Sequence, residues 1–189
     1  MPDDQNFKTQ THQLSAKKSD EDRCDHSNVR STAAPENDPT VATARLMATL
    51  YYFMAKEVIE TLGEEKGREI IRRAVWKFGF YRGAKIREAV DKRGLEPNLE
   101  TLVQYYDLPA SNLVQAEVDV SSNNYSETTR YCTFAEVWKA FGAEALGLIY
   151  CEQDFALAAG FNEEIKCERP SNMMEPGSDK CRLLMKLQR

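Results

Sequence analysis

A cysteine and an aspartate lie three residues apart in the stretch LIYCEQDFALAAGF, residues 148–161. Residues three apart on a helix share a face, so Cys151 and Asp154 point the same way, and Tyr150 lies one turn before Asp154. An aspartate that faces inward needs a cation, a hydrogen-bond donor or a ligand. Beside it, the thiol can serve as a nucleophile or pack as a small apolar side chain. Without other information, packing is the commoner role for such a thiol.

Histidine is missing from the part of the chain that we expect to fold. His12 and His26 both lie in the first forty residues. A Ser-His-Asp triad, a Cys-His pair and the usual histidine-containing zinc site are therefore excluded from the folded body. Any catalysis there must use Cys, Asp, Glu, Lys, Arg, Tyr or Ser.

The other cysteines of the body have different settings. Cys132 ends a predicted strand directly before a predicted helix, whose free N–H groups favour a thiolate. Cys167 and Cys181 continue alternating apolar patterns and are predicted to be core residues. The wide intervals between the cysteines do not predict a metal site, although thiolate and carboxylate chemistry would permit one from Cys132, Cys151, Asp154 and Cys181.

One arginine stands out among the basic residues of the first half. In FGFYRGAK, Arg82 lies between Gly79 and Gly83, where another element can approach closely. The remaining basic residues of this segment are predicted to be a solvated face.

Composition separates a polar tail from a folded body. Residues 1–40 contain one aromatic residue and many Ser, Asp, Lys and Asn, so we expect them to be disordered. Residues 41–189 are long enough for one domain. The net charge is −5, and the body alone is nearly balanced, which argues against nucleic acid as a partner. No membrane span or signal peptide is apparent, so we expect a cytoplasmic protein with reduced thiols.

Along the body, the spacing of apolar residues changes between the period of a helix, about 3.6 residues, and that of a strand, two residues. Helices are predicted over 41–62, where apolar residues recur at Leu46, Leu50 and Met54, and over 64–93. Further helices are predicted after Asn98, from a capping box formed by Thr133 and Glu136 to about Gly142, and over 143–159. Strands are predicted over 113–120, 126–132, 161–167 and 181–187. This order predicts an α+β fold: an antiparallel sheet of about four strands covered by a long N-terminal helix pair and a second helix pair.

The C-terminal half also resembles the L-2-amino-thiazoline-4-carboxylic acid hydrolase family. The residues that carry the resemblance are Cys132, Gly142, Tyr150-Cys151, Asp154, Gly160-Phe161, Gly177 and Cys181. They span roughly a third of the chain, with a weaker likeness in residues 63–83. The last strand departs from the family pattern, with Leu183 where an aromatic residue is expected.

The resemblance implies hydrolysis of a carbon–nitrogen bond in a cyclic amidine-like ring, opening 2-aminothiazoline-4-carboxylate to a carbamoyl-cysteine. On that basis Cys151 is the expected nucleophile, and Asp154 pairs with the amidinium or relays the proton. Arg82 is expected to hold the substrate carboxylate, with Cys132, Tyr150 and Cys181 lining the pocket. The resemblance implies no cofactor and no metal. Families of this kind include members with other substrates, so the name does not fix the reaction.

Two further functions stay open from the residues alone. The first is a non-catalytic module that binds a small molecule in an α+β body. The second is a metal-binding protein. The sequence also leaves open whether the chain forms a homo-oligomer.

Overall fold

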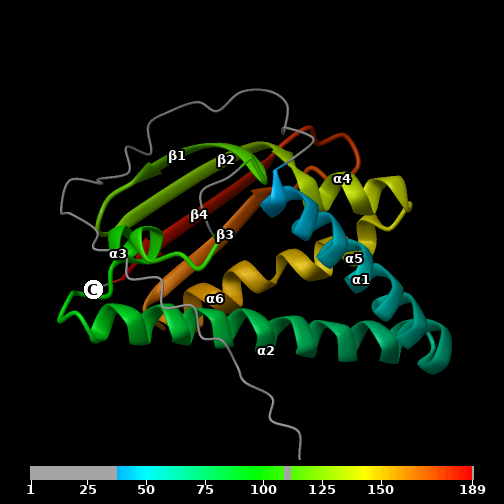
Figure 1. Ribbon diagram of the computed structural model, residues 1–189, viewed down its shortest axis with the longest axis horizontal. Coiled ribbons are helices and arrows are strands. Elements are labelled where there is room, and N and C mark those ends of the chain that lie inside the picture. Colours follow the sequence, from blue (N-terminus) through cyan, green and yellow to red (C-terminus); the bar gives the residue numbers. More distant parts are fainter. Residues whose placement is uncertain (1–37, 109–111, 189) are drawn as a thin grey trace, which may run out of the picture.

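Figure 1 shows the computed structural model of the chain, which describes residues 38–108 and 112–188. The predicted disordered tail lies outside these residues, except for residues 38–40. Those three belong to the first helix, because the side chain of Asp38 accepts hydrogen bonds from the N–H groups of Thr40 and Val41 and caps it.

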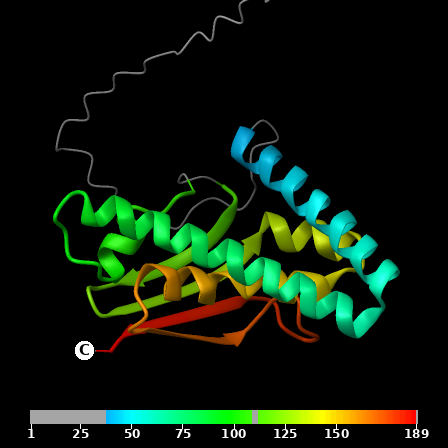
Figure 2. The same ribbon diagram turned by 90° about the horizontal axis from the view of Figure 1, so that it is seen from below.

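Two long helices begin the described chain, as the periodicity predicts. Helix α1 spans Pro39–Leu62 and helix α2 spans Glu64–Asp91. Gly63, at a φ of 81°, ends the first and begins the second, a conformation that other residues rarely adopt. Figures 1 and 2 show the two helices diverging from this glycine as a V.

Helix α3 and the first hairpin follow in the predicted order. Helix α3 spans Leu99–Gln104, and Asn98 and Thr101 form a capping box at its start. Strand β1, Val114–Val120, pairs antiparallel with β2, Asn124–Cys132.

Two predictions about the next helices are wrong in detail. Helix α4, Thr133–Ala140, has Cys132 at its N-cap, and the Thr133 hydroxyl donates to the carbonyl of Leu113, so the expected capping box does not form. The single helix predicted over 143–159 is two helices, α5, Glu144–Cys151, and α6, Gln153–Phe161, which meet at Glu152.

The four strands form one antiparallel sheet with helices on one face. Strands β3, Ile165–Ser171, and β4, Cys181–Leu187, complete the order β1-β2-β4-β3. Figures 1 and 2 show α6 between the sheet and α2, while α1 crosses over α4 and α5. The α+β fold predicted from the sequence is confirmed.

The apolar stripe of α1 faces away from the core, whereas an apolar stripe on a helix usually packs against it. Leu46, Leu50 and Met54 expose 72%, 61% and 61% of their surface, whereas Ala44 and Ala48 of the same helix are buried. Small residues let α1 lie close to α4, where the Trp138 indole N–H donates to the carbonyl of Ala48 at 3.0 Å.

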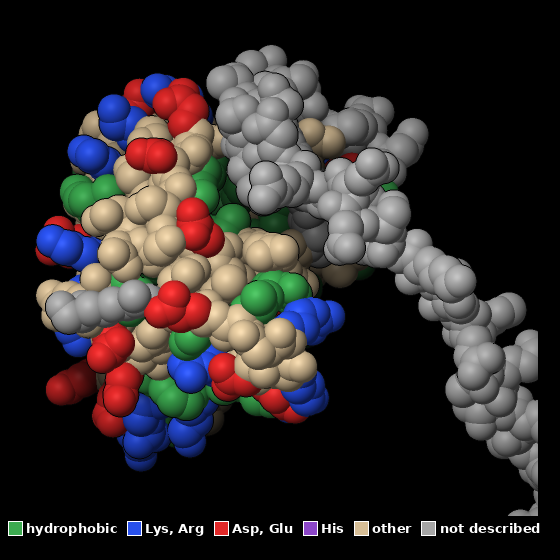
Figure 3. Space-filling view, turned by 90° about the vertical axis from the view of Figure 1, so that its left-hand side faces the viewer, with side chains coloured by type: hydrophobic (Ala, Val, Ile, Leu, Met, Phe, Trp, Pro, Cys, Tyr) green, Lys and Arg blue, Asp and Glu red, His purple; other side chains and the backbone are tan. Residues whose placement is uncertain are grey.

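Within residues 38–108 and 112–188, no helix is long and apolar enough to cross a membrane. On the face shown in Figure 3, acidic and basic side chains are interspersed.

Candidate functional site

The inner face of the sheet carries polar side chains where an apolar layer would be usual. Arg169 and Cys167 come from β3, Cys181 from β4, and Glu127 and Thr129 from β2. Thr129 pairs with Cys181 across the two central strands, and Glu127 pairs with Leu183. Because alternate residues of a strand share a face, this register gathers the polar groups beneath α5 and α6.

Asp154 and Arg169 form a half-buried ion pair at the centre of this region. Nη2 of Arg169 donates to Oδ2 of Asp154 at 2.5 Å, and the two side chains expose 12% and 27% of their surface. Nη1 of Arg169 donates to the backbone carbonyl of Cys151 at 3.0 Å. The cation that the sequence analysis required for an inward Asp154 is therefore Arg169, which ties the α5–α6 junction to β3.

Asn172, which is 2% exposed, connects two of the predicted site cysteines. Its Oδ1 accepts from Sγ of Cys181 at 3.6 Å and from the N–H of Met174 at 3.0 Å. Its side chain also hydrogen-bonds to Cys151 and favours the thiolate there. Cys151 and Cys181 thus share one polar neighbour.

The thiols of this region are held in their protonated form. Burial raises the pKa of Cys151 to about 12, against the opposing effect of Arg169. Burial also raises the pKa of Cys132 to about 11, although the N–H groups of Ala135 and Phe134 at the start of α4 favour the thiolate. Cys132 and Asp154 each raise the pKa of Cys151 further, which places the three groups in one electrostatic neighbourhood.

Glu127 is a carboxylate of the inner face that the sequence analysis missed. The hydroxyls of Tyr125 and Thr129 both donate to it. Glu127 and Asp154 raise the pKa of Cys181, while Arg169 lowers it. The region therefore holds a second carboxylate that is already saturated with neutral donors.

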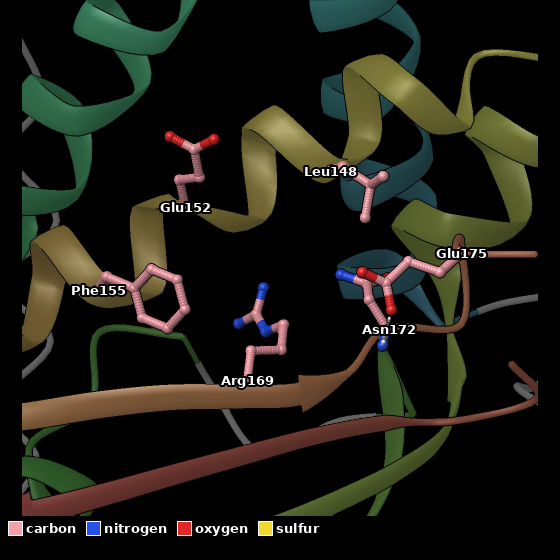
Figure 4. A pocket seen from close by; sticks show the side chains of 6 residues that line it. All are labelled: Leu148, Glu152, Phe155, Arg169, Asn172 and Glu175. Atoms are coloured by element: carbon pink, nitrogen blue, oxygen red, sulfur yellow. Dashed lines mark hydrogen bonds between the residues drawn. The ribbon is translucent and has the colours of Figure 1, made fainter.

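A pocket of about 220 Å³ lies beside these groups: Arg169 and Asn172 line it, whereas Cys132, Cys151, Asp154 and Cys181 do not. Figure 4 shows Arg169 reaching from β3 toward its middle, with Glu152 and Leu148 extending from the helices above and Asn172 beside it. Phe155 and Glu175 complete the lining. Glu152 is held at the rim, because both of its oxygens accept from Nε of Arg72 at 2.8 and 2.9 Å. A small polar molecule in this pocket would meet Arg169 and Asn172 directly.

Arg82 is buried and fully engaged by protein groups. Its Nε and Nη2 donate to the two oxygens of Asp107 at 2.8 and 2.6 Å, and its Nη1 donates to Oε1 of Gln153 at 2.8 Å. Gly79 and Gly83 lie against α6, where an added Cβ would collide with the carbonyls of Gln153 and Leu157. The close approach predicted around Arg82 is present, and it joins α2 to α6.

Tyr150 belongs to an aromatic cluster on the helical side of the site. Its ring centroid lies 4.9 Å from those of Tyr51 and Trp138 and 5.5 Å from that of Phe134. Burial raises the pKa of Tyr150 to about 12, while Arg82 and a hydrogen bond to Gln153 oppose that effect. The cluster fixes the end of α5 and hence the position of Cys151.

The structure brings Cys132, Cys151, Asp154 and Cys181 into one electrostatic neighbourhood, whereas Arg82 lies at the contact of α2 with α6. Across the described ranges, no group of three or more His, Cys, Asp or Glu side chains is placed to hold a metal ion.

Arg169 and Asn172 are the residues that sequence analysis missed and that touch the predicted ones. Extending the alternation of Ile165 and Cys167 by one step would have placed Arg169 on the inner face. Asn172 lies in the polar connection between β3 and β4, and no pattern in the sequence singles it out.

Comparison with known proteins agrees with the resemblance noted in the sequence. The profile of the L-2-amino-thiazoline-4-carboxylic acid hydrolase family matches residues 43–184, which include α2 to β3 completely and most of α1 and β4. No functionally curated protein matches the chain.

Two solved structures resemble the fold at low sequence identity. A trafficking protein particle complex subunit 3 from Naegleria fowleri, covalently bound to palmitic acid, is 16% identical at a TM-score of 0.50; the match covers 78% of this chain and 96% of that chain. The phenol-responsive sensory domain of the transcription activator PoxR, with phenol, is 15% identical at a TM-score of 0.44, over 76% of this chain and 74% of that one. At these identities the first shows a shared fold alone.

Proposed function

This chain belongs to the L-2-amino-thiazoline-4-carboxylic acid hydrolase family, and from that premise we propose that it hydrolyses a cyclic amidine-like ring with Cys151 and Asp154. The observation that carries the proposal is the position of this pair: Arg169, which lines the pocket, contacts the Asp154 carboxylate and the Cys151 backbone. Arg169 thus links the pocket to Cys151 and Asp154, which lie behind its lining.

The reaction begins with a protonated thiol, because burial raises the pKa of Cys151 to about 12. Asp154 accepts the proton as Sγ bonds to the ring carbon that is flanked by sulfur and nitrogen. The bond from this carbon to the ring nitrogen breaks, and the nitrogen leaves as an amine with the proton from Asp154. Water then attacks the same carbon and Sγ departs, taking a proton back. One water is consumed, and 2-aminothiazoline-4-carboxylate becomes an S-carbamoyl-cysteine.

The other predicted site residues have supporting roles in this proposal. Cys132 and Cys181 form the walls around the reacting thiol, and Tyr150 fixes the end of α5. Arg82, expected from the sequence to bind the carboxylate, holds Gln153 at the start of α6.

The test is turnover of L-2-amino-thiazoline-4-carboxylic acid by the purified protein, with carbamoyl-cysteine measured by mass spectrometry. Cys151→Ser should lose at least 100-fold in kcat, and Asp154→Asn should lose much of the rate while remaining folded. Cys167→Ser is the matched control, because it makes the same change at another inner-face thiol and should retain activity. Full turnover by Cys151→Ser would eliminate the nucleophile assignment.

A second candidate function is a small-molecule-binding module without catalysis. The raised pKa values of Cys132, Cys151 and Cys167 favour it, since protonated thiols are poor nucleophiles. Alkylation separates the two functions. A catalytic Cys151 should react fastest and be protected by a small amidine or thiazoline, whereas equally slow reaction of all four body thiols would support the binding module.

A further inference from the structure

The Asp154–Arg169 pair has the charge pattern of a zwitterion, and its arginine lines the pocket. A ring that carries an amidinium and a carboxylate has the opposite charge at each of its two ends. Of the six residues that line the pocket, Arg169 is the one cation, and Glu152 and Glu175 are the anions. Asp154 lies directly behind Arg169.

The hydrogen bonding of Arg169 is incomplete. Its Nη1 and Nη2 have partners, but its Nε is buried and has no hydrogen-bond partner among the described residues. A buried polar group without a partner destabilises a protein. A carboxylate that accepts from this guanidinium would relieve that penalty, and Arg is the side chain best suited to bind one.

Arg82 differs from Arg169 both in its hydrogen bonding and in its position relative to the pocket. All three of its side-chain nitrogens donate to Asp107 or Gln153, and it is not among the residues that line the pocket. Binding a substrate carboxylate at Arg82 would require breaking a two-pronged ion pair.

We propose that Arg169 is the specificity-determining residue of this site: it binds the carboxylate of a zwitterionic cyclic amidine, and Asp154 faces the amidinium end. This inference rests on the proposed function for the identity of the ring. The face of Phe155 completes the contact, since its ring centroid lies 5.2 Å from the guanidinium carbon of Arg169 and restrains the plane of the cation.

The experiment compares two rings that differ by the carboxylate alone, L-2-amino-thiazoline-4-carboxylic acid and 2-amino-2-thiazoline. For wild type and for each variant, we divide kcat/KM for the acid by kcat/KM for 2-amino-2-thiazoline. Arg169→Met should lower this ratio at least 10-fold, chiefly through KM for the acid, as expected for a lost charge-assisted contact. Arg169→Lys keeps the charge and should lie between wild type and Arg169→Met. A general loss of structure would affect both rings and leave the ratio unmoved.

Arg82→Met is the matched control, because it removes another buried, ion-paired arginine. It should lower stability and preserve the ratio. The assignment would be overturned by an unchanged ratio in Arg169→Met, or by a ratio that falls in Arg82→Met and not in Arg169→Met. Circular dichroism of every variant establishes that it is folded, and Arg169→Lys provides the comparison if Arg169→Met is not.

A binding measurement separates this inference from the reaction. If wild type hydrolyses neither ring, the proposed function fails, and thermal stabilisation by each ring still tests Arg169. A rise in Tm with the acid that is present in wild type and absent in Arg169→Met supports the carboxylate site. Equal stabilisation of wild type and Arg169→Met by the acid contradicts it.

Discussion

At the scale of single residues, burial determines the resting state of the site. Each of the three cysteines with a pKa near 11 or 12 owes the shift first to burial, and Arg169 lowers the values of Cys151 and Cys167. In the reaction that we propose, the Cys151 thiol needs a proton acceptor at the moment of attack. We assign that role to Asp154, whose carboxylate accepts a hydrogen bond from Arg169.

The raised pKa of Cys151 has a consequence for stability. An ordinary thiol has a pKa of 9.0, while folded Cys151 ionises near 12. Between these values the unfolded chain binds fewer protons, so the free energy of unfolding falls as pH rises, by about 1.4 kcal/mol per pH unit for one such thiol. Cys151→Ala should therefore lose less stability than wild type between pH 9 and 10.

Urea denaturation at pH 7, 9 and 10 measures this difference. Cys132→Ala is a second test: it too should lose less stability than wild type between pH 9 and 10, because burial raises the pKa of Cys132 to about 11. Parallel stability profiles for wild type and Cys151→Ala would show that the folded thiol ionises as easily as the unfolded one.

At the scale of elements, the contact of α2 with α6 positions the site. Gly83 lies against the backbone of Leu157, and Gly160 of α6 lies against the carbonyl of Phe80. These glycines let the two helices approach to backbone contact, and Arg82 joins the same helices through Gln153. A shift of α6 would move Asp154 relative to Arg169.

Gly83→Ala should therefore destabilise the protein, although alanine is the better helix former. An added methyl group would collide with the carbonyl of Leu157, and overpacking of this kind costs about 1–3 kcal/mol. The control is Ala84→Gly, the reverse exchange on the exposed face of the same helix. It should lower the free energy of unfolding by only about 1 kcal/mol. Chemical denaturation measures both, and a more stable Gly83→Ala would show that the helices separate freely.

At the scale of the whole molecule, the exposed stripe of α1 is a candidate contact between two copies. Leu46, Met47, Leu50, Phe53 and Met54 expose between 42% and 72% of their surface. Their spacing is symmetric about Leu50, with residues at three and four positions on either side, so two antiparallel copies of the stripe would be self-complementary. Pairing two such stripes would remove large apolar side chains of both copies from water, as the core of a dimer interface requires.

We therefore expect a dimer in which Leu50 lies near the two-fold axis. Leu50→Glu and Leu50→Lys should each be monomeric, because like charges would meet at the axis, and an equimolar mixture should associate again. Leu95→Glu changes another exposed leucine and should leave the dimer intact. Analytical ultracentrifugation at micromolar concentration measures the mass, and a wild-type monomer would rule out this interface.

The sequence by itself determined the local structure and the family. Apolar periodicity, the glycine after α1 and the cap at Asn98 specify helices and strands through contacts within one or two turns, which is why most elements occur as predicted. Such local patterns do not report a break as slight as the one at Glu152. They predicted Cys151 and Asp154 to be neighbours on one helix; the two residues lie in α5 and α6, on either side of that break, and Asp154 still raises the pKa of Cys151.

Only the tertiary structure decided what these neighbours face. The partner of Asp154 is Arg169, fifteen residues away on β3, and the pairing depends on strand register and on the depth at which α6 lies above the sheet. The same holds for α1, whose alanine face is buried and whose leucine face is exposed. Periodicity defines a stripe on a helix, but close packing selects the face that fits, and at α4 small side chains fit better than large ones.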